Sequence, residues 1–355
     1  MSAHQPAWRV TVNGEDISAA IKPRLVSLMV TDEAGIKSDS VEIVLADHLG
    51  AERIEIPPTG AEIEVVMGYD GNTRDMGLFI ADEVTVEGAP DVMRIRAAAS
   101  VHGRSAGGKT AITAQTSRSW PAGTLLGDMV KAIAAEHGLA VSVSDAVAAI
   151  VLPHIDQINE SDISLLTRIA LSRDLVCKPA GGRLVLVARG EGRTASGAAM
   201  PSITLRPADV SRWSMSGALR NMHARVVATY QDTAGGGPAE VEVETPTSIV
   251  GAGARGDEIL AEASATKRLR RTYPDRATAI GAATAEAGKA KRDAVKLSLT
   301  LPGRPDLSAE ARISLEGFRP GVDREWIVTG VTHTIDASGY RCSVKAELPG
   351  QVSEP

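Results

Sequence analysis

The stretch at residues 154–170 reads HIDQINESDISLLTRIA and predicts a polar corner at which a strand turns into a helix. Ser161 and Asp162 stand just before residues that are apolar at helical spacing, namely Ile163, Leu166, Ile169 and Ala170. Ser and Asp side chains accept hydrogen bonds from the free amides at a helix start, and Asp also favours the positive end of the helix dipole. We therefore predict a helix here that is capped by Ser161 or Asp162.

The residues around this corner predict a mixed α/β region. Before it, apolar residues again recur at helical spacing and Gly138 follows as a stop signal: Leu125, Leu126, Met129, Val130 and Ile133. After it, residues 184–188 are apolar and typical of a strand. Loose Gly-rich stretches flank the whole region, so we place a mixed α/β domain at residues 104–195.

Working outward, short strand patterns lie on both sides of this domain. Up to about residue 99, apolar and polar residues alternate between turn signals such as Asn13-Gly14, which is typical of a small antiparallel barrel. Strand patterns return at residues 224–230 and 295–348. The expected fold class is α+β, mainly β, with two small antiparallel β-barrel domains flanking the mixed α/β domain.

The boundaries of the two predicted barrels follow from these patterns. The N-terminal β-barrel takes residues 1–103, and the second β-barrel is assembled from residues 196–232 and 291–350. Between these two pieces, residues 233–290 are predicted to form a loop and helical insert in the second barrel region. The Ala-rich residues 277–294 favour the helix, because Ala has the highest helix propensity.

Composition and charge exclude several classes of protein. The 355 residues carry a net charge of −6 with no long basic stretch, whereas nonspecific phosphate binding needs clustered Lys and Arg, so we expect no specific nucleic-acid binding. Cys177 and Cys342 are far apart and form no CxxC pair, which predicts two buried thiols in a reducing compartment. No signal peptide and no apolar run of membrane-spanning length is seen, so we expect assembly in the cytoplasm and no membrane anchor.

One string imitates a nucleotide site. Residues 103–110 read GRSAGGKT and match the P-loop pattern, in which Gly103 and its neighbours would wrap the phosphates and Lys109 and Thr110 would contact them and the magnesium ion. A P-loop must run directly into a helix, whose N-terminus adds its dipole. The residues after Thr110 are instead β-branched and turn-like, so a flexible connector is the favoured interpretation and nucleotide binding the alternative.

The other chemical motifs are weaker still. Gly251, Gly253 and Gly256 match a dinucleotide-binding string, but no βαβ unit can be drawn around them. The seven histidines are scattered without ligand spacing, and His154 near Asp156 favours a surface or packing role. The sequence therefore predicts no catalytic residue, no cofactor-binding residue and no metal-binding residue, and no cofactor.

The corner at residues 154–170 resembles the middle motif of the phage late control D proteins, and related motifs occur in the N-terminal hub part of type VI secretion spike proteins. Other stretches fit the same family in the same order, namely residues 10–17, 24–32, 39–45, 76–83, 117–120, 301–305, 326–328 and 339–340. The resemblance covers nearly the whole chain, and residues 233–292 carry little of it.

This resemblance implies a structural baseplate hub of a contractile phage tail or related injection system, and no enzyme. Hubs of the family are homotrimers whose subunits each carry two related barrels, so that a pseudo-sixfold ring adapts a hexameric tail tube to a trimeric spike. The implied partners are other copies of the chain, the tail tube protein, the central spike protein and a tape measure protein. The implied location is the host cytoplasm during assembly and then the virion tail baseplate.

Two other functions remain as alternatives. A P-loop nucleotide hydrolase would need a parallel βαβ core, whereas the patterns here indicate short antiparallel strands. A transcription regulator, prompted only by the family's name, would need a helix-turn-helix and a basic face, and the sequence shows neither.

Overall fold

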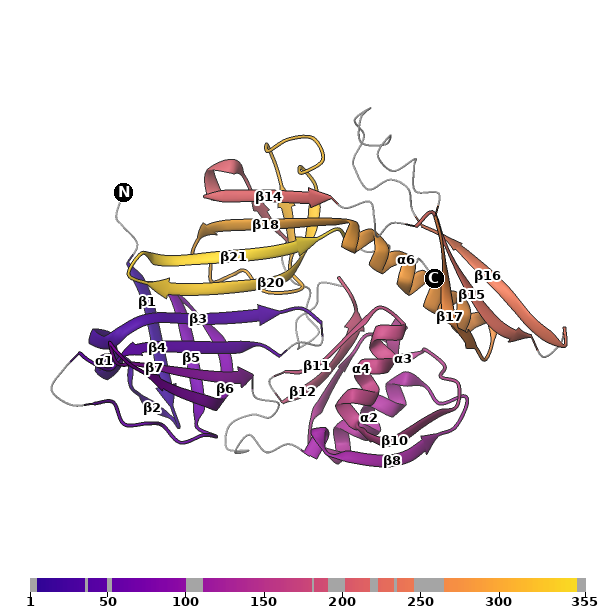
Figure 1. The fold of residues 1–355 in the computed structure, drawn as a ribbon, viewed down its shortest axis with the longest axis horizontal. Helices are drawn as coiled ribbons and strands as arrows, with labels where there is room; N and C mark the ends of the chain where they lie inside the picture. The colour runs from indigo at the N-terminus through magenta and orange to yellow at the C-terminus, as the bar shows by residue number, and fades with distance from the viewer. Residues whose placement is uncertain are drawn as a thin grey trace.

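A computed structural model describes residues 5–35, 38–49, 53–99, 111–180, 182–190, 202–217, 223–232, 235–245 and 265–349. Figure 1 shows one large sheet with two smaller units beside it, a middle unit and a unit built around the long helix α6. The prediction of a mainly β, α+β fold is confirmed. In the described residues, no helix is long and apolar enough to cross a membrane.

The first half of the large sheet comes from the N-terminal part of the chain. Its elements are β1 (Pro6–Val12), β2 (Glu15–Asp16), α1 (Ser18–Ile21), η1 (Lys22–Arg24), β3 (Leu25–Glu33), β4 (Ser40–Ala46), β5 (Glu62–Tyr69), β6 (Asn72–Glu87) and β7 (Val92–Ala99). The predicted alternation holds, since in β5 the side chains of Ile63, Val65 and Met67 are buried and those between them are more exposed.

The second half comes mainly from the C-terminal part. Its elements are β13 (Ile203–Leu205), η3 (Pro207–Asp209), β14 (Arg212–Gly217), β18 (Val295–Pro302), β19 (Arg312–Leu315), β20 (Glu325–Asp336) and β21 (Gly339–Glu347). β20 pairs antiparallel with β3, from Gly330 opposite Glu33 to Asp336 opposite Ser27. The two halves therefore form one 13-stranded sheet with a shared apolar core. Among the described strands, no pairing closes either half into a barrel.

The middle unit has its own apolar core. It contains η2 (Ala111–Thr113), β8 (Gln115–Trp120), α2 (Leu126–Glu136), β9 (Ala140–Val143), α3 (Asp145–Ala148), β10 (Ile155–Ser161), α4 (Asp162–Ser172), β11 (Leu175–Ala180) and β12 (Arg183–Ala188). The two predicted helices and the predicted strand at 184–188 are confirmed as α2, α4 and β12. Cys177 of β11 is buried, as is Cys342 of β21, and both are free thiols, as predicted.

The third unit differs from the predicted domain boundaries. It consists of β15 (Arg225–Asp232), β16 (Gly237–Glu244), β17 (Thr266–Tyr273) and α6 (Arg276–Ala294). The helix at 277–294 is confirmed, but the placement of residues 224–230 in the second barrel is wrong, because β15 pairs with β16 and β17 in a separate sheet. The reason is packing: Val226, Ala228 and Val241 of this sheet share a small core with alanines of α6. Residues 237–244, predicted as loop, are strand β16.

Buried and half-buried ion pairs connect the middle unit to the rest. Lys178 Nζ of β11 lies 3.1 Å and 3.2 Å from the two carboxylate oxygens of Asp39 and 3.7 Å from Asp32 Oδ1, both in the first half of the large sheet. At the other end, Arg292 of α6 pairs with Asp174, which follows α4, and with Glu347 of β21 at 3.3 Å. These contacts hold the three units together through charges that are paired.

Candidate functional site

The polar corner between β10 and α4 is the feature that the sequence singled out. Ser161 Oγ accepts a hydrogen bond from the Ser164 amide at 3.3 Å, and Ser161 and Asp162 are both buried. The predicted cap is therefore confirmed as Ser161. Asp162 is the first residue of α4, and its carboxylate has other partners.

A single guanidinium on the neighbouring strand collects these partners. β8 runs antiparallel to β10, which sets Arg118 opposite Gln157. Arg118 Nη2 donates to Asp162 Oδ1 at 2.5 Å, Nη1 donates to both carboxylate oxygens of Glu136 at 2.7 Å and 2.8 Å, and Nε donates to Gln157 Oε1 at 3.0 Å. Its Cζ also lies 4.8 Å from the centre of the Trp120 ring. Arg118 thus ties β8, α2, β10 and α4 together.

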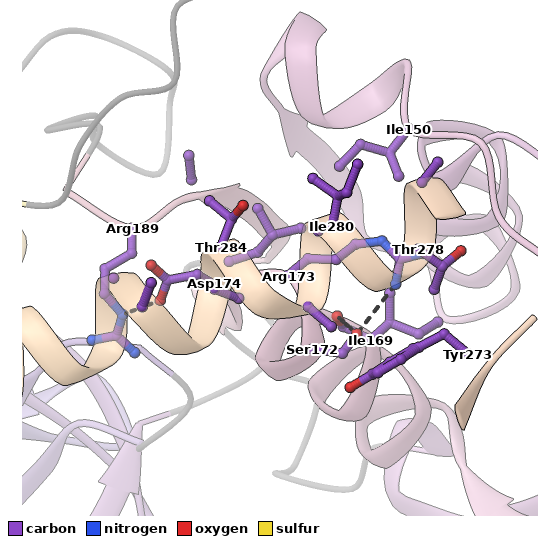
Figure 2. Close-up of a pocket in the computed structure, with 18 of the residues that line it drawn as sticks. Ile150, Ile169, Ser172, Arg173, Asp174, Arg189, Tyr273, Thr278, Ile280 and Thr284 are labelled. Atoms are coloured by element: carbon purple, nitrogen blue, oxygen red, sulfur yellow. Dashed lines mark hydrogen bonds and ion pairs between the residues drawn. The ribbon is translucent and has the colours of Figure 1, made fainter. Parts of the chain in front are cut away.

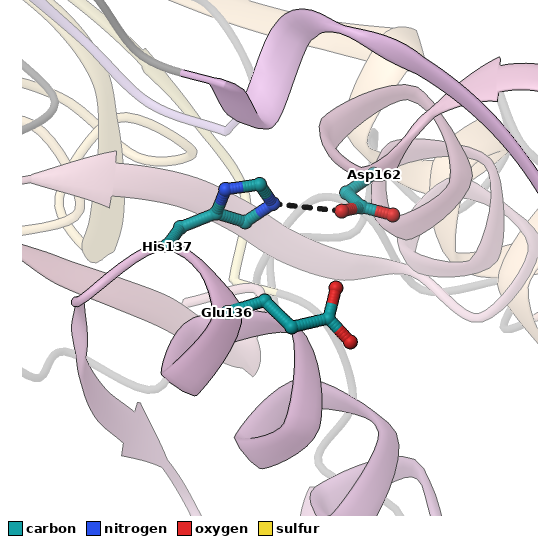
Figure 3. A group of neighbouring side chains, drawn as sticks. All are labelled: Glu136, His137 and Asp162. Atoms are coloured by element: carbon teal, nitrogen blue, oxygen red, sulfur yellow. Dashed lines mark hydrogen bonds and ion pairs between the residues drawn. The ribbon is translucent and has the colours of Figure 1, made fainter.

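Asp162 stays ionised in this setting. Burial by itself would raise the pKa of this carboxyl, but hydrogen bonds from Gln157 and His137 and the charge of Arg118 more than offset burial, so the pKa lies below its usual value. Gln157 Nε2 donates to Asp162 Oδ1 at 2.8 Å, and His137 Nε2 lies 2.7 Å from Oδ2. Figure 3 shows the His137 ring directed at the Asp162 carboxylate.

The same group also has the composition of a metal site. Glu136, His137 and Asp162 each offer one ligand atom, and these atoms lie within 4.8 Å of one another. Arg118 already pairs with both carboxylates, so the protein itself supplies the positive charge that a metal ion would bring. The arrangement links β8, α2 and α4 through ion pairs. Sequence reasoning singled out Asp162 but not its partners Arg118 and His137, nor Glu136, which pairs with Arg118.

The remaining sequence candidates do not assemble with this cluster. The P-loop string with Lys109 and Thr110, and the string with Gly251, Gly253 and Gly256, lie outside the described residues. His154 Nε2 lies 3.0 Å from Asp156 Oδ1, and both side chains are more than half exposed. This pair is on the surface, as the sequence indicated.

A buried thiol and imidazole lie together in the second half of the sheet. Cys342 Sγ is 3.3 Å from His333 Nδ1, and the Tyr340 hydroxyl is 2.8 Å from the same nitrogen. Burial raises the pKa of Cys342 to about 11 and lowers the pKa of His333 to about 4. Both groups are therefore neutral near pH 7, whereas a nucleophilic cysteine needs a thiolate. The three side chains of this cluster are therefore assigned a packing role in the core.

The two halves of the large sheet repeat one strand order. In the first half, the strands lie across the sheet in the order β3, β4, β7, β6, so the last of the four in the chain lies between the second and the third. In the second half, the order across the sheet is β14, β18, β21, β20, which is the same arrangement, and all neighbouring strands in both halves are antiparallel. An additional strand pairs with the early part of the third one in each half, β5 with β6 and β19 with β20. The two β regions are thus related in strand order, as predicted.

Each half also ends at an open edge. Among the described strands, β14 pairs only with β18, and residues 82–87 of β6 pair only with β7. Exposed apolar side chains lie on both edges: Met215 of β14 is 37% exposed, and Val86 of β6 is 47% exposed. Monomeric proteins usually protect such edges with charges, proline or bulges, so these edges are suited to pairing with another chain.

The comparisons with known proteins agree with this geometry. Residues 68–339 match the model of the phage tail baseplate hub family (GPD). The chain belongs to this family. It is similar to the probable baseplate hub proteins of Escherichia phage 186 (30% identity) and Escherichia phage P2 (31% identity), in both cases over 97% of this chain and 93% of the relative. The family resemblance read from the sequence is confirmed, and the nucleotide-binding alternative gains no support.

Solved structures of other tail and secretion proteins have a fold similar to that of this chain. The 43 kDa tail protein of prophage MuSo2 from Shewanella oneidensis matches with a TM-score of 0.69 and 13% identity, over 97% of this chain and 99% of that one. A type VI secretion system component from E. coli, described as similar to the T4 tail proteins gp27 and gp5, matches with a TM-score of 0.51 and 11% identity, over 98% of this chain and 78% of that one. This baseplate hub therefore shares its fold with parts of both kinds of machine.

Proposed function

We propose that the protein is a non-enzymatic hub subunit that forms a homotrimeric ring between a hexameric tail tube and a trimeric central spike. The observation that supports this most is the repeated strand order of the two sheet halves. A threefold ring offers six similar sites only if each subunit carries two similar modules, because the contacts of a symmetric assembly must match. Three copies with two halves each meet that condition.

The way the halves join within one chain suggests how the copies join. Inside the chain, the third strand of the second half, β20, pairs with the first strand of the first half, β3. The equivalent contact between copies joins the third strand of the first half, β6, to the first strand of the second half, β14. Those are the two strands with open edges, so repeating the internal junction three times closes the ring and leaves neither edge unpaired.

The other parts of the proposal follow from this role. The tail tube protein, the spike protein and a tape measure protein would contact the faces of the ring. The chain would be made in the host cytoplasm and then become part of the virion baseplate. This role needs no catalytic residue, cofactor or metal ion, and the cluster around Arg118 would have the structural role of linking elements of the middle unit.

The test uses a variant at each open edge. Met215→Glu on β14 and Val86→Glu on β6 each place a charge on one edge, and both positions are exposed in the single chain, so the fold should survive. Native mass spectrometry of the hub from assembled baseplates should give a trimer for the unaltered chain. Either variant alone should fail to close the ring.

A mixture of the two variants separates this arrangement from others. One copy keeps a good β6 edge and the other a good β14 edge, so a head-to-tail contact predicts a heterodimer that grows no further. An interface that used the same surface on both partners would give no such dimer. A stable dimer of the unaltered chain, or trimers from either variant, would overturn the proposed ring.

A further inference from the structure

A large groove separates α6 from the middle unit. It encloses about 1310 Å³ and runs between α4, α6 and the ends of β16 and β17. Figure 2 shows Ile150, Ile169, Tyr273, Ile280 and Thr284 along it. Small-molecule pockets measure roughly 300–1,000 Å³, so this groove has the size for a segment of protein.

The lining of the groove includes short and apolar side chains as well as cationic ones. Gly281, Thr284 and Ala285 of α6 line it, and these short side chains allow another helix to approach closely. Val151 at its edge is 62% exposed. An apolar strip of this kind, left open beside a helix, is the setting in which amphipathic helices bind to grooves.

Three cations of the groove have no carboxylate within ion-pair distance among the described residues. They are Arg173, Arg271 and Lys291. Arg173 donates to the neighbouring Ser172 Oγ at 3.2 Å, and Arg271 lies over the Tyr273 ring at 6.0 Å. Burial lowers the pKa of Lys291, and the nearby charges of Arg324 and Arg292 lower it further, so Lys291 has other cations as neighbours. The chain as a whole carries −6, so the groove is a local exception.

We propose that this groove binds an acidic amphipathic helix of a partner protein in the particle. The apolar side of that helix would lie against Gly281 and its neighbours, and its carboxylates would pair with Arg173, Arg271 and Lys291. Such pairs add specificity and speed the encounter, while the apolar lining residues supply affinity. This contact does not depend on the ring, because every residue named belongs to one chain.

Gly281 offers a direct test. A Cβ at this position meets no heavy atom within 4 Å, so a side chain can start here without strain, and we expect the longer side chain of Gly281→Leu to occupy the groove; leucine also favours helix more than glycine does. Gly281→Ala is the matched control, since it gives the helix the same benefit and leaves the groove open. The full chain is titrated, by fluorescence anisotropy, into a labelled peptide of about 18 residues, or five helical turns.

Two peptides share a leucine stripe and differ on the polar face, one carrying Glu and the other Lys. We expect the Glu peptide to bind and the Lys peptide not to bind. Gly281→Leu and the double variant Arg271→Glu with Lys291→Glu should each weaken binding of the Glu peptide at least tenfold, and salt should weaken it further. Gly281→Ala and a charge reversal outside the groove, Arg74→Glu, should leave binding unchanged.

Several outcomes would overturn the proposal. Equal binding of both peptides would show apolar adhesion without charge recognition, and unaltered affinity in Gly281→Leu would place the peptide elsewhere. Sedimentation of the chain alone provides a third measurement. Self-association that Gly281→Leu abolishes would make the occupant a second copy of this chain instead of a partner.

Discussion

At the scale of single residues, Arg118 joins four elements of the middle unit. Its partners Glu136, Gln157 and Asp162 lie 18, 39 and 44 residues further along the chain. The sequence limited the cap to Ser161 or Asp162, because a cap is set by residues three positions apart. It did not show the Arg118 cluster, because that cluster exists only once β8 lies against β10.

Replacing Arg118 should destabilise the middle unit. Arg118→Ala leaves Asp162, which is only 4% exposed, with a buried charge and fewer donors, and we expect the free energy of unfolding to fall by about 2–3 kcal/mol. Lys131→Ala, which removes an exposed pair with Asp128, should change it by less than about 1 kcal/mol. Urea unfolding followed by circular dichroism compares the two. Equal effects would mean that Arg118 contributes no more than a surface pair.

At the scale of elements, local patterns predicted helices better than strand partners. α2, α4 and α6 could be read from spacing, stop signals and Ala content, all of which lie within one segment. The partners of β15 could not, because an apolar strand fits any sheet of matching polarity and pairing is decided by distant residues. β16 was hidden by its composition, Gly237 and Pro238 followed by alternating Glu, which favours loop when no neighbour is known.

The turn after β18 gives a prediction at this scale. A Cβ added to Gly303 would lie 2.0 Å from Cδ1 of the Tyr340 ring, and Tyr340 also packs against Tyr69 and contacts His333. Gly303→Ala must therefore displace this ring, and we expect a loss of about 1–3 kcal/mol in the free energy of unfolding. Gly281→Ala is the matched control, because its added Cβ meets open space and should stabilise α6 by up to about 1 kcal/mol. Thermal unfolding of the two variants should shift in opposite directions.

At the scale of the whole molecule, one acidic cluster meets three parts of the chain. Asp32 of β3 accepts a hydrogen bond from the Ala309 amide, which belongs to the second half of the sheet, at 2.8 Å. It also faces Asp39 of the first half and Lys178 of the middle unit. The sequence predicted a first β region and a middle domain but not this junction, since residues 32, 178 and 309 come together only in the finished fold.

The junction should make the stability of the molecule depend on pH. Burial, with the nearby charge of Asp39, raises the pKa of Asp32 from 3.8 to about 6. Between about pH 4 and pH 6 the folded chain therefore holds a proton at this site that the unfolded chain has released. The stability that this bound proton contributes is fully present below the unfolded pKa of 3.8 and is lost as pH rises through the folded pKa of about 6.

Asp32→Asn removes this proton and keeps an oxygen for the Ala309 amide. Unfolding in urea at steps from pH 4 to pH 7 should show the stability of the unaltered chain falling relative to the variant across that window. Carboxyls with lowered pKa, such as Asp162 and Glu42, act in the opposite sense and at lower pH, and they are common to both proteins, so they cancel in the difference between the two curves, which reports on Asp32 and its junction. Parallel curves would mean that Asp32 titrates alike in the folded and unfolded chains, and the junction would then hold the three parts together without sensing pH.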